Sequence, residues 1–386
     1  MSKITRRTFV TAAMAAMAGM AGAQLAFAAT APTGSSQAPD AAQADEELPY
    51  GTLDTDEIKA LIAQAEQIAG DDEFLKMTQL QQCKLVSEQD NPNLDDLIEP
   101  IRLFDNLYFF GTNNVGVFVF TTPEGYIMID SGLNHFPAEV ILPGMESLGL
   151  DPAQVKYILV SHAGPDHIGG AYYFQQTFGT KVVMSEPEYA RTPEPEENAA
   201  RLEAMGAPDY KYNPYNLNGL PWPDKDIVGE DGDVVRLGDF GVTMVRCPRV
   251  VDGGGLSFIA PVYDNGEEHM WATYGNTNII GGLADLEVYH QSVSHFLDYV
   301  QEMDVDVIIS NHPFVDGSAD RMAELRGRAE GDPNPFVIGN DKVSAFIELL
   351  DQCRAVIAAR LEAGLNEYGN AYVEPGYSIS AVPKGK

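Results

Sequence analysis

Ten residues in the middle of the chain constrain its fold more than any other segment. Residues 161–170 read Ser-His-Ala-Gly-Pro-Asp-His-Ile-Gly-Gly. The apolar, β-branched run at 155–160 before them predicts a buried strand, and residues 171–174 after them predict the start of a helix. Two histidines and an aspartate therefore lie where a strand gives way to a helix. In α/β folds this edge is where ligands and catalytic groups are placed.

Further strands are predicted on both sides of this loop. They cover 101–104, 107–110, 116–120 and 126–130 before it, and 181–184, 234–237, 242–245, 256–259, 269–272 and 305–310 after it. Helical patterns cover 54–82, 137–149, 289–303 and 343–365, with Thr55 as the predicted N-cap of the first. Asp264-Asn265-Gly266 is typical of a hairpin turn. Clusters of strands separated and followed by helices indicate a layered α/β sandwich.

The N-terminus has the pattern of a twin-arginine signal peptide. Arg6-Arg7 precede a short apolar run rich in small residues, and Ala26-Phe27-Ala28 provides a cleavage site. A membrane anchor is the alternative, but the run is short for a span and lacks Leu and Ile. We expect residues 1–28 to be removed and the protein to be exported folded by the twin-arginine machinery. It would then be periplasmic or extracellular, with no stable membrane anchor.

The formal net charge of −33 limits the partners of this chain. Removal of residues 1–28 takes away three basic and no acidic residues and changes the charge to −36. So acidic a surface repels nucleic acid and anionic lipid, and we expect neither as a partner. Residues 29–47 are predicted to be a disordered linker and 48–386 a single domain. This domain has an N-terminal helical extension at about 54–82 and a cleft-covering insertion at about 186–230.

The cysteines give no sign of a disulfide framework. Cys83, Cys247 and Cys353 are odd in number, far apart and not arranged as a C-x-x-C metal knuckle. Cys247 follows a predicted strand, and its expected role is that of a small buried hydrophobe.

Three side chains suggest a metal site. Asp166 and His167 follow one predicted strand, and His312 follows another. If the two strand ends converge, Asp, His and His make a three-ligand zinc set with an open position for water. A histidine at a strand end is, however, often only a hydrogen-bonded structural residue. Of the other histidines, His135 and His269 show no partner pattern. His290 and His295 lie five apart, off one helical face, and we expect them to be surface or capping residues.

The central loop resembles the His-x-His-x-Asp-His signature of the metallo-β-lactamase superfamily. The strand end at 130–132 resembles the superfamily's aspartate strand, and segments 256–262 and 311–314 resemble later conserved segments in the right order. The likeness extends over roughly residues 100–350. It implies an αββα four-layer sandwich with two adjacent metal sites at one edge.

The resemblance also implies that one of these sites is lost. The first site would use His162, but its other two ligand positions hold Gly164 and Val250, which cannot bind zinc. The second site, Asp166, His167 and His312, is complete. His162 is a further candidate ligand of that site or an assisting base. Asp252 is a candidate replacement ligand, although an aspartate in such a loop usually makes turn hydrogen bonds.

Two functions follow from this asymmetry. In the first, one zinc ion activates water to hydrolyse an ester, lactone or amide substrate, with Asp166 and His162 as candidate catalytic residues. In the second, the chain is an inactive relative that binds a small molecule or a protein in the old cleft, or keeps the fold for assembly with a partner. Hydrolysis of β-lactams does not follow from the resemblance, because specificity resides in loops.

Overall fold

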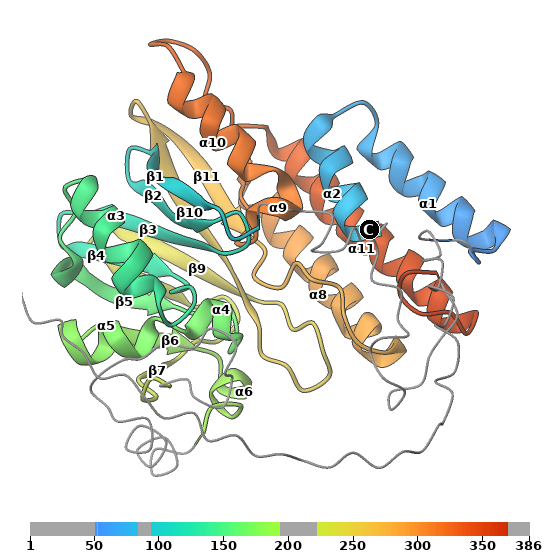
Figure 1. Cartoon of the computed structure of the whole chain (residues 1–386), viewed down its shortest axis with the longest axis horizontal. Helices are drawn as coiled ribbons and strands as arrows, with labels where there is room; N and C mark the ends of the chain where they lie inside the picture. Colours follow the sequence, from blue (N-terminus) through green and yellow to red (C-terminus); the bar gives the residue numbers. More distant parts are fainter. Residues whose placement is uncertain (1–50, 52, 84–93, 194–221, 370–386) are drawn as a thin grey trace, which may run out of the picture. The chain divides into compact units, whose positions relative to one another are not determined.

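The computed structural model describes residues 51, 53–83, 94–193 and 222–369, and its framework is two β-sheets (Figure 1). The larger sheet has seven strands in the order β1 to β7. They are β1 (Leu97–Phe104), β2 (Leu107–Thr112), β3 (Gly116–Thr122), β4 (Gly125–Ile129), β5 (Val155–Leu159), β6 (Lys181–Met184) and β7 (Ile227–Val228). Neighbours are antiparallel from β1 to β4 and parallel from β4 to β7.

The smaller sheet has five strands in the order β12-β11-β10-β9-β8. They are β8 (Val234–Leu237), β9 (Phe240–Arg246), β10 (Leu256–Asp264), β11 (Glu267–Thr273) and β12 (Val307–Ile308). All pairs are antiparallel except β11 with β12. The predicted hairpin turn between β10 and β11 is confirmed, with Asn265 and Gly266 at φ of 53° and 84°, the left-handed conformations that a tight turn of this kind needs.

Helices cover the outer face of each sheet. Those of the first half are α1 (Asp56–Ala69), α2 (Glu73–Cys83), a π-helical turn (Pro137–Ile141) that continues into α3 (Leu142–Ser147), a 3₁₀ turn (Pro152–Gln154), α4 (Pro165–Ile168), α5 (Ala171–Phe178) and α6 (Glu186–Tyr189). Those of the second half are α8 (Leu283–Glu302), α9 (Pro313–Asp316), α10 (Ser318–Gly327) and α11 (Asn340–Glu362).

The alternation of side chains along the strands creates the layers. Phe118 and Phe120 of β3 point into the core between the sheets, where both rings pack edge-on against Trp271 at 5.2 Å. Val117 and Val119 of the same strand point outward to the core under α3 and α5. On the other sheet, the outer face packs on α8 and α11, and α1 and α2 pack on α11. The predicted αββα sandwich is therefore confirmed.

Two elements differ from the sequence-based expectation. The single helix expected over 54–82 is two helices, because Gly70 at φ 55° ends α1. The predicted N-cap is confirmed, since the hydroxyl of Thr55 accepts a hydrogen bond from the backbone N–H of Ile58. The strand expected over 305–310 contains only β12.

The predicted signal peptide, the linker and residues 194–221 of the predicted insertion lie outside the described residues.

The expectation about the cysteines is wrong. Cys83 at the end of α2 and Cys353 in α11 form a disulfide, and both side chains are fully buried. Sequence spacing gave no sign of this pair because 270 positions separate its members. Cys247 is free and buried, as expected. The disulfide fastens the N-terminal helical extension to the last long helix of the domain.

Among the described residues, no helix combines the length and the apolar character needed to cross a membrane.

The disulfide predicts a specific pattern of thiol labelling and stability. Without reductant, the denatured protein should react with iodoacetamide at one cysteine per chain, and after reduction at all three. The double variant Cys83→Ser/Cys353→Ser should lose about 2–4 kcal/mol of unfolding free energy, measured with urea, because its unfolded chain is no longer cross-linked. Reductant should destabilise the wild type and leave this variant unchanged. Labelling of three thiols without reductant would contradict the pairing.

Candidate metal site

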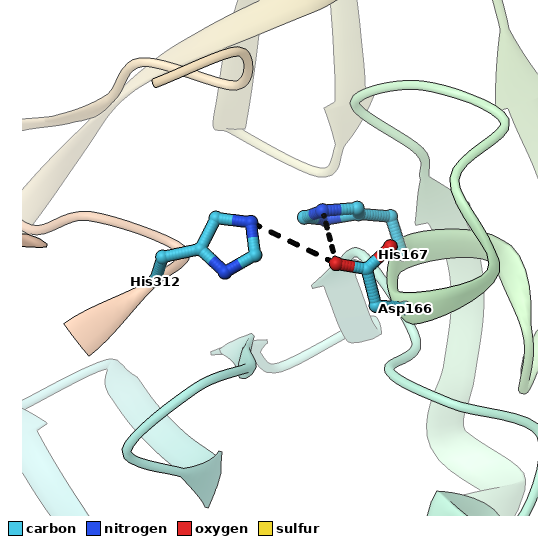
Figure 2. Close-up of side chains that lie close together, drawn as sticks. All are labelled: Asp166, His167 and His312. Carbon is cyan, nitrogen blue, oxygen red and sulfur yellow. Dashed lines mark ion pairs between the residues drawn. The ribbon is translucent and has the colours of Figure 1, made fainter. Parts of the chain in front are cut away.

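Asp166, His167 and His312 come together at one edge of the sandwich. The Oδ2 atom of Asp166 lies 3.2 Å from Nε2 of His167 and 3.7 Å from Nε2 of His312 (Figure 2). One ligand atom from each residue lies within 4.8 Å of the others. Both histidines are buried and the aspartate is half-buried. This Asp/His/His cluster is the set of candidate ligands that the sequence pointed to.

The cluster forms where the ends of the two sheets meet. Asp166 and His167 lie on α4, a single turn that begins after Gly164 with Pro165 at its first position, where a missing N–H costs nothing. His312 follows β12 of the other sheet. Backbone hydrogen bonds join the segments, from Gly116 N–H to the Asn311 carbonyl at 2.8 Å and from Leu256 N–H to the Ser161 carbonyl at 2.8 Å. β5, which precedes Asp166 and His167, and β12, which precedes His312, therefore belong to different sheets, and their ends converge at the site.

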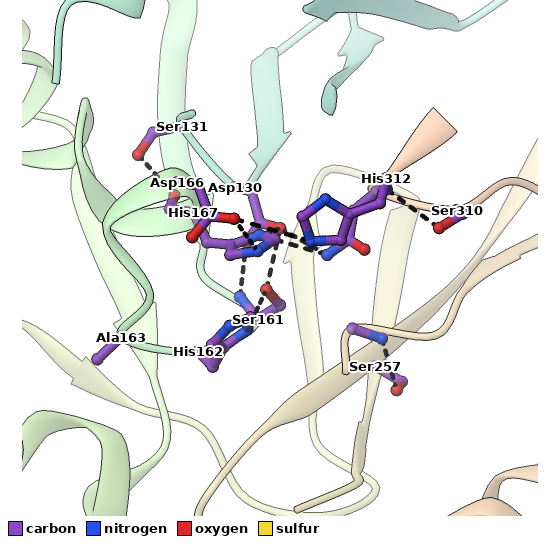
Figure 3. Close-up of polar contacts among 12 residues, drawn as sticks. Asp130, Ser131, Ser161, His162, Ala163, Asp166, His167, Ser257, Ser310 and His312 are labelled. Carbon is purple, nitrogen blue, oxygen red and sulfur yellow. Dashed lines mark hydrogen bonds and ion pairs between the residues drawn. The ribbon is translucent and has the colours of Figure 1, made fainter. Parts of the chain in front are cut away.

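Asp130 supports the cluster through hydrogen bonds. It follows β4 at φ 56°, a conformation that costs a non-glycine residue free energy and needs support from its surroundings. Its carboxylate accepts hydrogen bonds from the N–H and hydroxyl of Ser161, at 2.7 and 2.9 Å, and from Nδ1 of His167 at 2.8 Å (Figure 3). The amide of Asn311 donates to it as well, at 3.2 Å. Asp130 thus links three loops of the site.

These contacts aim the imidazoles at a common point. His167 uses Nδ1 to donate to Asp130, and His312 uses Nδ1 to donate to the carbonyl of Asn114 at 2.6 Å. In both rings Nε2 is the atom left to bind a metal, which is the usual arrangement of a ligating histidine and its outer partner. Nε2 of His167 is buried and makes no well-aligned hydrogen bond among the described residues, and its neighbour is Oδ2 of Asp166 at 3.2 Å. A buried polar atom left in this way fits a metal ligand.

The charges of the cluster are strongly coupled. Burial opposes protonation of His167, but Asp166 and Asp130 outweigh it and raise the pKa of His167 to about 10. Burial and the neighbouring His167 lower the pKa of His312 to about 4. Burial favours the neutral form of Asp166, yet the nearby histidines hold its pKa well below the usual range. Without a metal, the cluster therefore consists of one carboxylate, one imidazolium and one neutral imidazole.

His162 lies beside the cluster and outside it. Its ring is 4.2 Å from that of His167, and its Nδ1 is 3.2 Å from the Ser161 hydroxyl. Burial and then the neighbouring His167 lower the pKa of His162 well below its usual value. A Cβ atom at Gly164 would lie 2.8 Å from Nε2 of His162 and 2.9 Å from Oδ1 of Asp166. A side chain at position 164 would therefore require the side chains of His162 and Asp166 to shift.

The other candidates lie elsewhere. Asp252 is exposed in a turn at φ 61° and does not join the cluster. Three of the remaining histidines pair with acidic side chains away from the site: His269 with Asp306, His290 with Asp351 and His295 with Asp231. Nothing in the structure brings these residues to the cluster.

Sequence patterns missed three groups around the site. The carbonyl of Asn114 carried no signal, because a backbone acceptor has no residue signature. Glu188 of α6 is 2% exposed and accepts hydrogen bonds from the N–H groups of Ala163 and Gly254, both at 2.9 Å. Arg249 interacts electrostatically with Asp166 and His162. It stands next to Val250, where the resemblance places a histidine.

Comparison with known proteins agrees with this geometry. Residues 109–258 match the family model of the Metallo-beta-lactamase superfamily. The fold is similar to that of BJP-1, a subclass B3 metallo-beta-lactamase of Bradyrhizobium japonicum, with a TM-score of 0.54 and 24% identity over 70% of this chain and 98% of that one. It is also similar to the FEZ-1 metallo-beta-lactamase from Legionella gormanii, with a TM-score of 0.54 and 21% identity over 69% and 97% of the two chains.

Two sheets faced by helices make up this type of fold, and the cluster of Asp and His lies at one edge of it. Residues 109–258 are similar to the metallo-beta-lactamase superfamily, and the described part of the chain has the fold of the metallo-beta-lactamases compared above. The donor set fits zinc, which binds imidazole nitrogen and carboxylate oxygen and keeps an open position when only three protein ligands are present.

The role of Asp130 can be tested with a matched pair of variants. Asp130→Asn puts an amide where four donors from three residues converge, so His167 loses the partner that orients it. We expect the dissociation constant for zinc to rise about 10–100-fold, measured by competition with a chromophoric chelator. Asp306→Asn changes another Asp–His pair, that with His269, and should leave zinc affinity unchanged. Equal affinities of both variants and the wild type would contradict the role of Asp130.

Zinc binding should also release a proton. Near pH 6 the metal-free protein holds His167 protonated, since its pKa is raised to about 10, and His312 neutral, since its pKa is lowered to about 4. A metal on Nε2 of His167 must displace one proton, so the affinity should fall roughly tenfold for each pH unit lowered. Calorimetry in two buffers of different ionisation enthalpy should show about one proton released per zinc. No release near pH 6 would mean that His167 is already neutral.

Proposed function

We propose that this protein is an exported hydrolase of the metallo-β-lactamase fold that binds one zinc ion at Asp166, His167 and His312. Its substrate would be an ester, a lactone or an amide. One observation carries the proposal. Both buried histidines already donate through Nδ1, to Asp130 and to the Asn114 carbonyl, so that both Nε2 atoms face the carboxylate of Asp166.

The residues around the proposed zinc ion have different roles. Zinc held by three protein ligands supplies, when bound, a nucleophile from water near neutral pH and polarisation of the carbonyl under attack. Asp166 directs Oδ2 to the two histidines, and its Oδ1 lies on the side of Gly164, where it is available to accept a hydrogen bond. Its lowered pKa makes His162 a weak base, so it suits a hydrogen-bonding role better than that of a general base.

Several observations support a single metal ion. Two ligand positions of the first site that the resemblance implies hold Gly164 and Val250. His162 and Asp166 lie so close to Gly164 that a side chain there would collide with both. Asp252 is exposed and does not replace a ligand. The second site keeps all three ligands and their hydrogen-bond partners.

The proposed location rests on the N-terminal sequence and on the cysteines. Arg6-Arg7, the apolar run and Ala26-Phe27-Ala28 support export through the twin-arginine pathway, which makes its machinery a partner of the precursor. A buried disulfide is typical of proteins that work in an oxidising compartment. We infer a periplasmic or extracellular protein that meets a small-molecule substrate.

The loss of the first site favours one alternative. In this alternative the protein has no catalytic activity and uses the cleft to bind a small molecule or a protein. Gly164 and Val250 favour this function, because they stand at ligand positions and cannot bind zinc. The two functions differ in their requirement for metal, since binding without hydrolysis needs none.

Metal content distinguishes the two functions. The mature protein, purified without chelator and incubated with zinc, should contain about one zinc per chain by elemental mass spectrometry. Asp166→Ala and His312→Ala should each lose it, and His290→Gln, a histidine paired with Asp351 outside the cluster, should keep it. Esterase, lactonase and amidase activity should follow the metal across these variants. Absence of zinc from the wild type would contradict the hydrolase and favour the binding protein.

A further inference from the structure

The N-terminal helical extension lies outside the residues that match the family model, yet it packs beside a candidate metal ligand. The model matches residues 109–258, whereas the extension consists of α1 and α2. Figure 1 shows α2 beside α11 and beside α9, the short helix that begins directly after His312. The disulfide between Cys83 and Cys353 fastens the end of α2 to α11. The extension is therefore fixed to the domain and in contact with the segment that carries His312.

Asp316, the last residue of α9, holds this segment in place. Its side chain is fully buried. Oδ2 accepts a hydrogen bond from the N–H of Ser310 at 2.8 Å, and Oδ1 accepts one from the N–H of Ser318 at 2.9 Å and another from its hydroxyl. The hydroxyl of Ser310 in turn accepts a hydrogen bond from the N–H of His312 at 3.0 Å. One carboxylate therefore fixes the backbone on both sides of His312.

Arg321 of α10 is the cation that pairs with this carboxylate. Its Nη2 atom lies 2.9 Å from Oδ2 of Asp316, and its side chain is 11% exposed. Its Nε and Nη1 atoms are buried and make no hydrogen bond with any described residue. Two phenylalanine rings contact the guanidinium, with Cζ 4.6 Å from the ring centre of Phe74 in α2 and 4.7 Å from that of Phe336. A buried guanidinium with so few hydrogen bonds depends on these cation–π contacts for its position.

Two side chains of α2 connect the extension to this arrangement. Phe74 contacts Arg321 and is itself stacked on Phe346 of α11, with the ring centres 5.4 Å apart. The hydroxyl of Thr78 is buried and shares its hydrogen bond between the carbonyls of Phe74 in its own helix and Val315 in α9, both at 3.3 Å. The contacts of α2 therefore reach both α9 and α10.

The position of this backbone decides where the imidazole of His312 points. Its Nδ1 donates to the Asn114 carbonyl at 2.6 Å, and its Nε2 lies 3.7 Å from Oδ2 of Asp166. A shift of the backbone at His312 would lengthen the first contact and turn Nε2 away from the second. Groups that orient a ligating histidine contribute to metal affinity without touching the metal.

We propose that the N-terminal extension is a positioning element of the metal site, and that Thr78, Arg321 and Asp316 are positioning residues for His312. The inference rests on the proposed function, since His312 is a zinc ligand of that proposal. The three side chains act through the backbone of residues 310–318 and not as ligands. The affinity for zinc then depends on helices outside the residues that match the family model.

The first measurement is the dissociation constant for zinc of the mature protein, by competition with a chromophoric chelator. Arg321→Gln removes the charge that pairs with Asp316 and should raise this constant about tenfold or more. Arg321→Lys keeps the charge without the planar group and should fall between. Arg328→Gln is the matched control, because Arg328 directly follows the same helix and pairs with Asp264. It should stay within about twofold of the wild type.

Thr78 allows a conservative rescue. Thr78→Val keeps the shape of the side chain but removes the hydroxyl that holds the Val315 carbonyl, and should raise the dissociation constant for zinc about threefold or more. Thr78→Ser keeps the hydroxyl and should restore the wild-type value. Ile58→Ala in α1 leaves a buried cavity and should lower the melting temperature. It should leave the dissociation constant within about twofold of the wild type.

Nitrogen NMR of the metal-free protein near pH 7 gives a readout that needs no zinc. In the wild type the His312 ring, assigned by its loss in His312→Gln, should be the Nδ1–H tautomer, because Nδ1 donates to the Asn114 carbonyl. Arg321→Gln and Thr78→Val should show both tautomers, whereas the rescue and control variants should keep the wild-type signal. A loss of stability alone does not change the tautomer in the folded protein.

The outcomes separate this inference from the proposed function. If the wild type binds zinc and both Arg321→Gln and Thr78→Val bind it equally well, the positioning inference is overturned and the metal site stands. An equal loss of affinity in Ile58→Ala also overturns it, because stability would then set the affinity. If the wild type binds no zinc, the hydrolase proposal fails, and an unchanged His312 tautomer in both variants overturns the positioning inference. If Arg321→Gln does not fold, the Thr78 variants decide in the same way.

Discussion

The buried carboxylate of Asp130 is the interaction on which the rest of the site depends. It receives hydrogen bonds from Ser161 and His167 in the segment after β5, and from Asn311 in the segment after β12. Each of these donors is buried, so leaving any of them unpaired would cost about 1–3 kcal/mol. The strained backbone of Asp130 at φ 56° is maintained by the same contacts. His167, a candidate metal ligand, is therefore positioned by Asp130, which is not itself a candidate ligand.

Much of this architecture could be predicted from the sequence, and the reason is physical. Alternating apolar residues and turn signals define the strands, and Asp166, His167 and His312 stand at strand ends, where polar side chains converge in such folds. The disulfide could not be found, since its cysteines meet only after the helices at 73–83 and 340–362 have packed together. The carbonyl of Asn114 and the bridging role of Glu188 depend on loop conformations that spacing does not encode.

The site is asymmetric in a way that suggests a change of chemistry and not decay. A decaying site would lose the outer hydrogen bonds together with the ligands, because both need precise geometry. Here the Asp/His/His cluster keeps both of its Nδ1 acceptors. On the other side of the site, Gly164 is closely packed by His162 and Asp166.

The most direct test of this account is X-ray absorption spectroscopy of the mature protein loaded with zinc. The account predicts a four-coordinate zinc with two imidazole nitrogens and oxygen ligands at about 2.0–2.2 Å, and no second metal within about 4 Å. Three or more imidazole ligands would mean that His162 has moved into the coordination sphere. A zinc–zinc distance near 3.5 Å would show a two-metal site and would contradict the account.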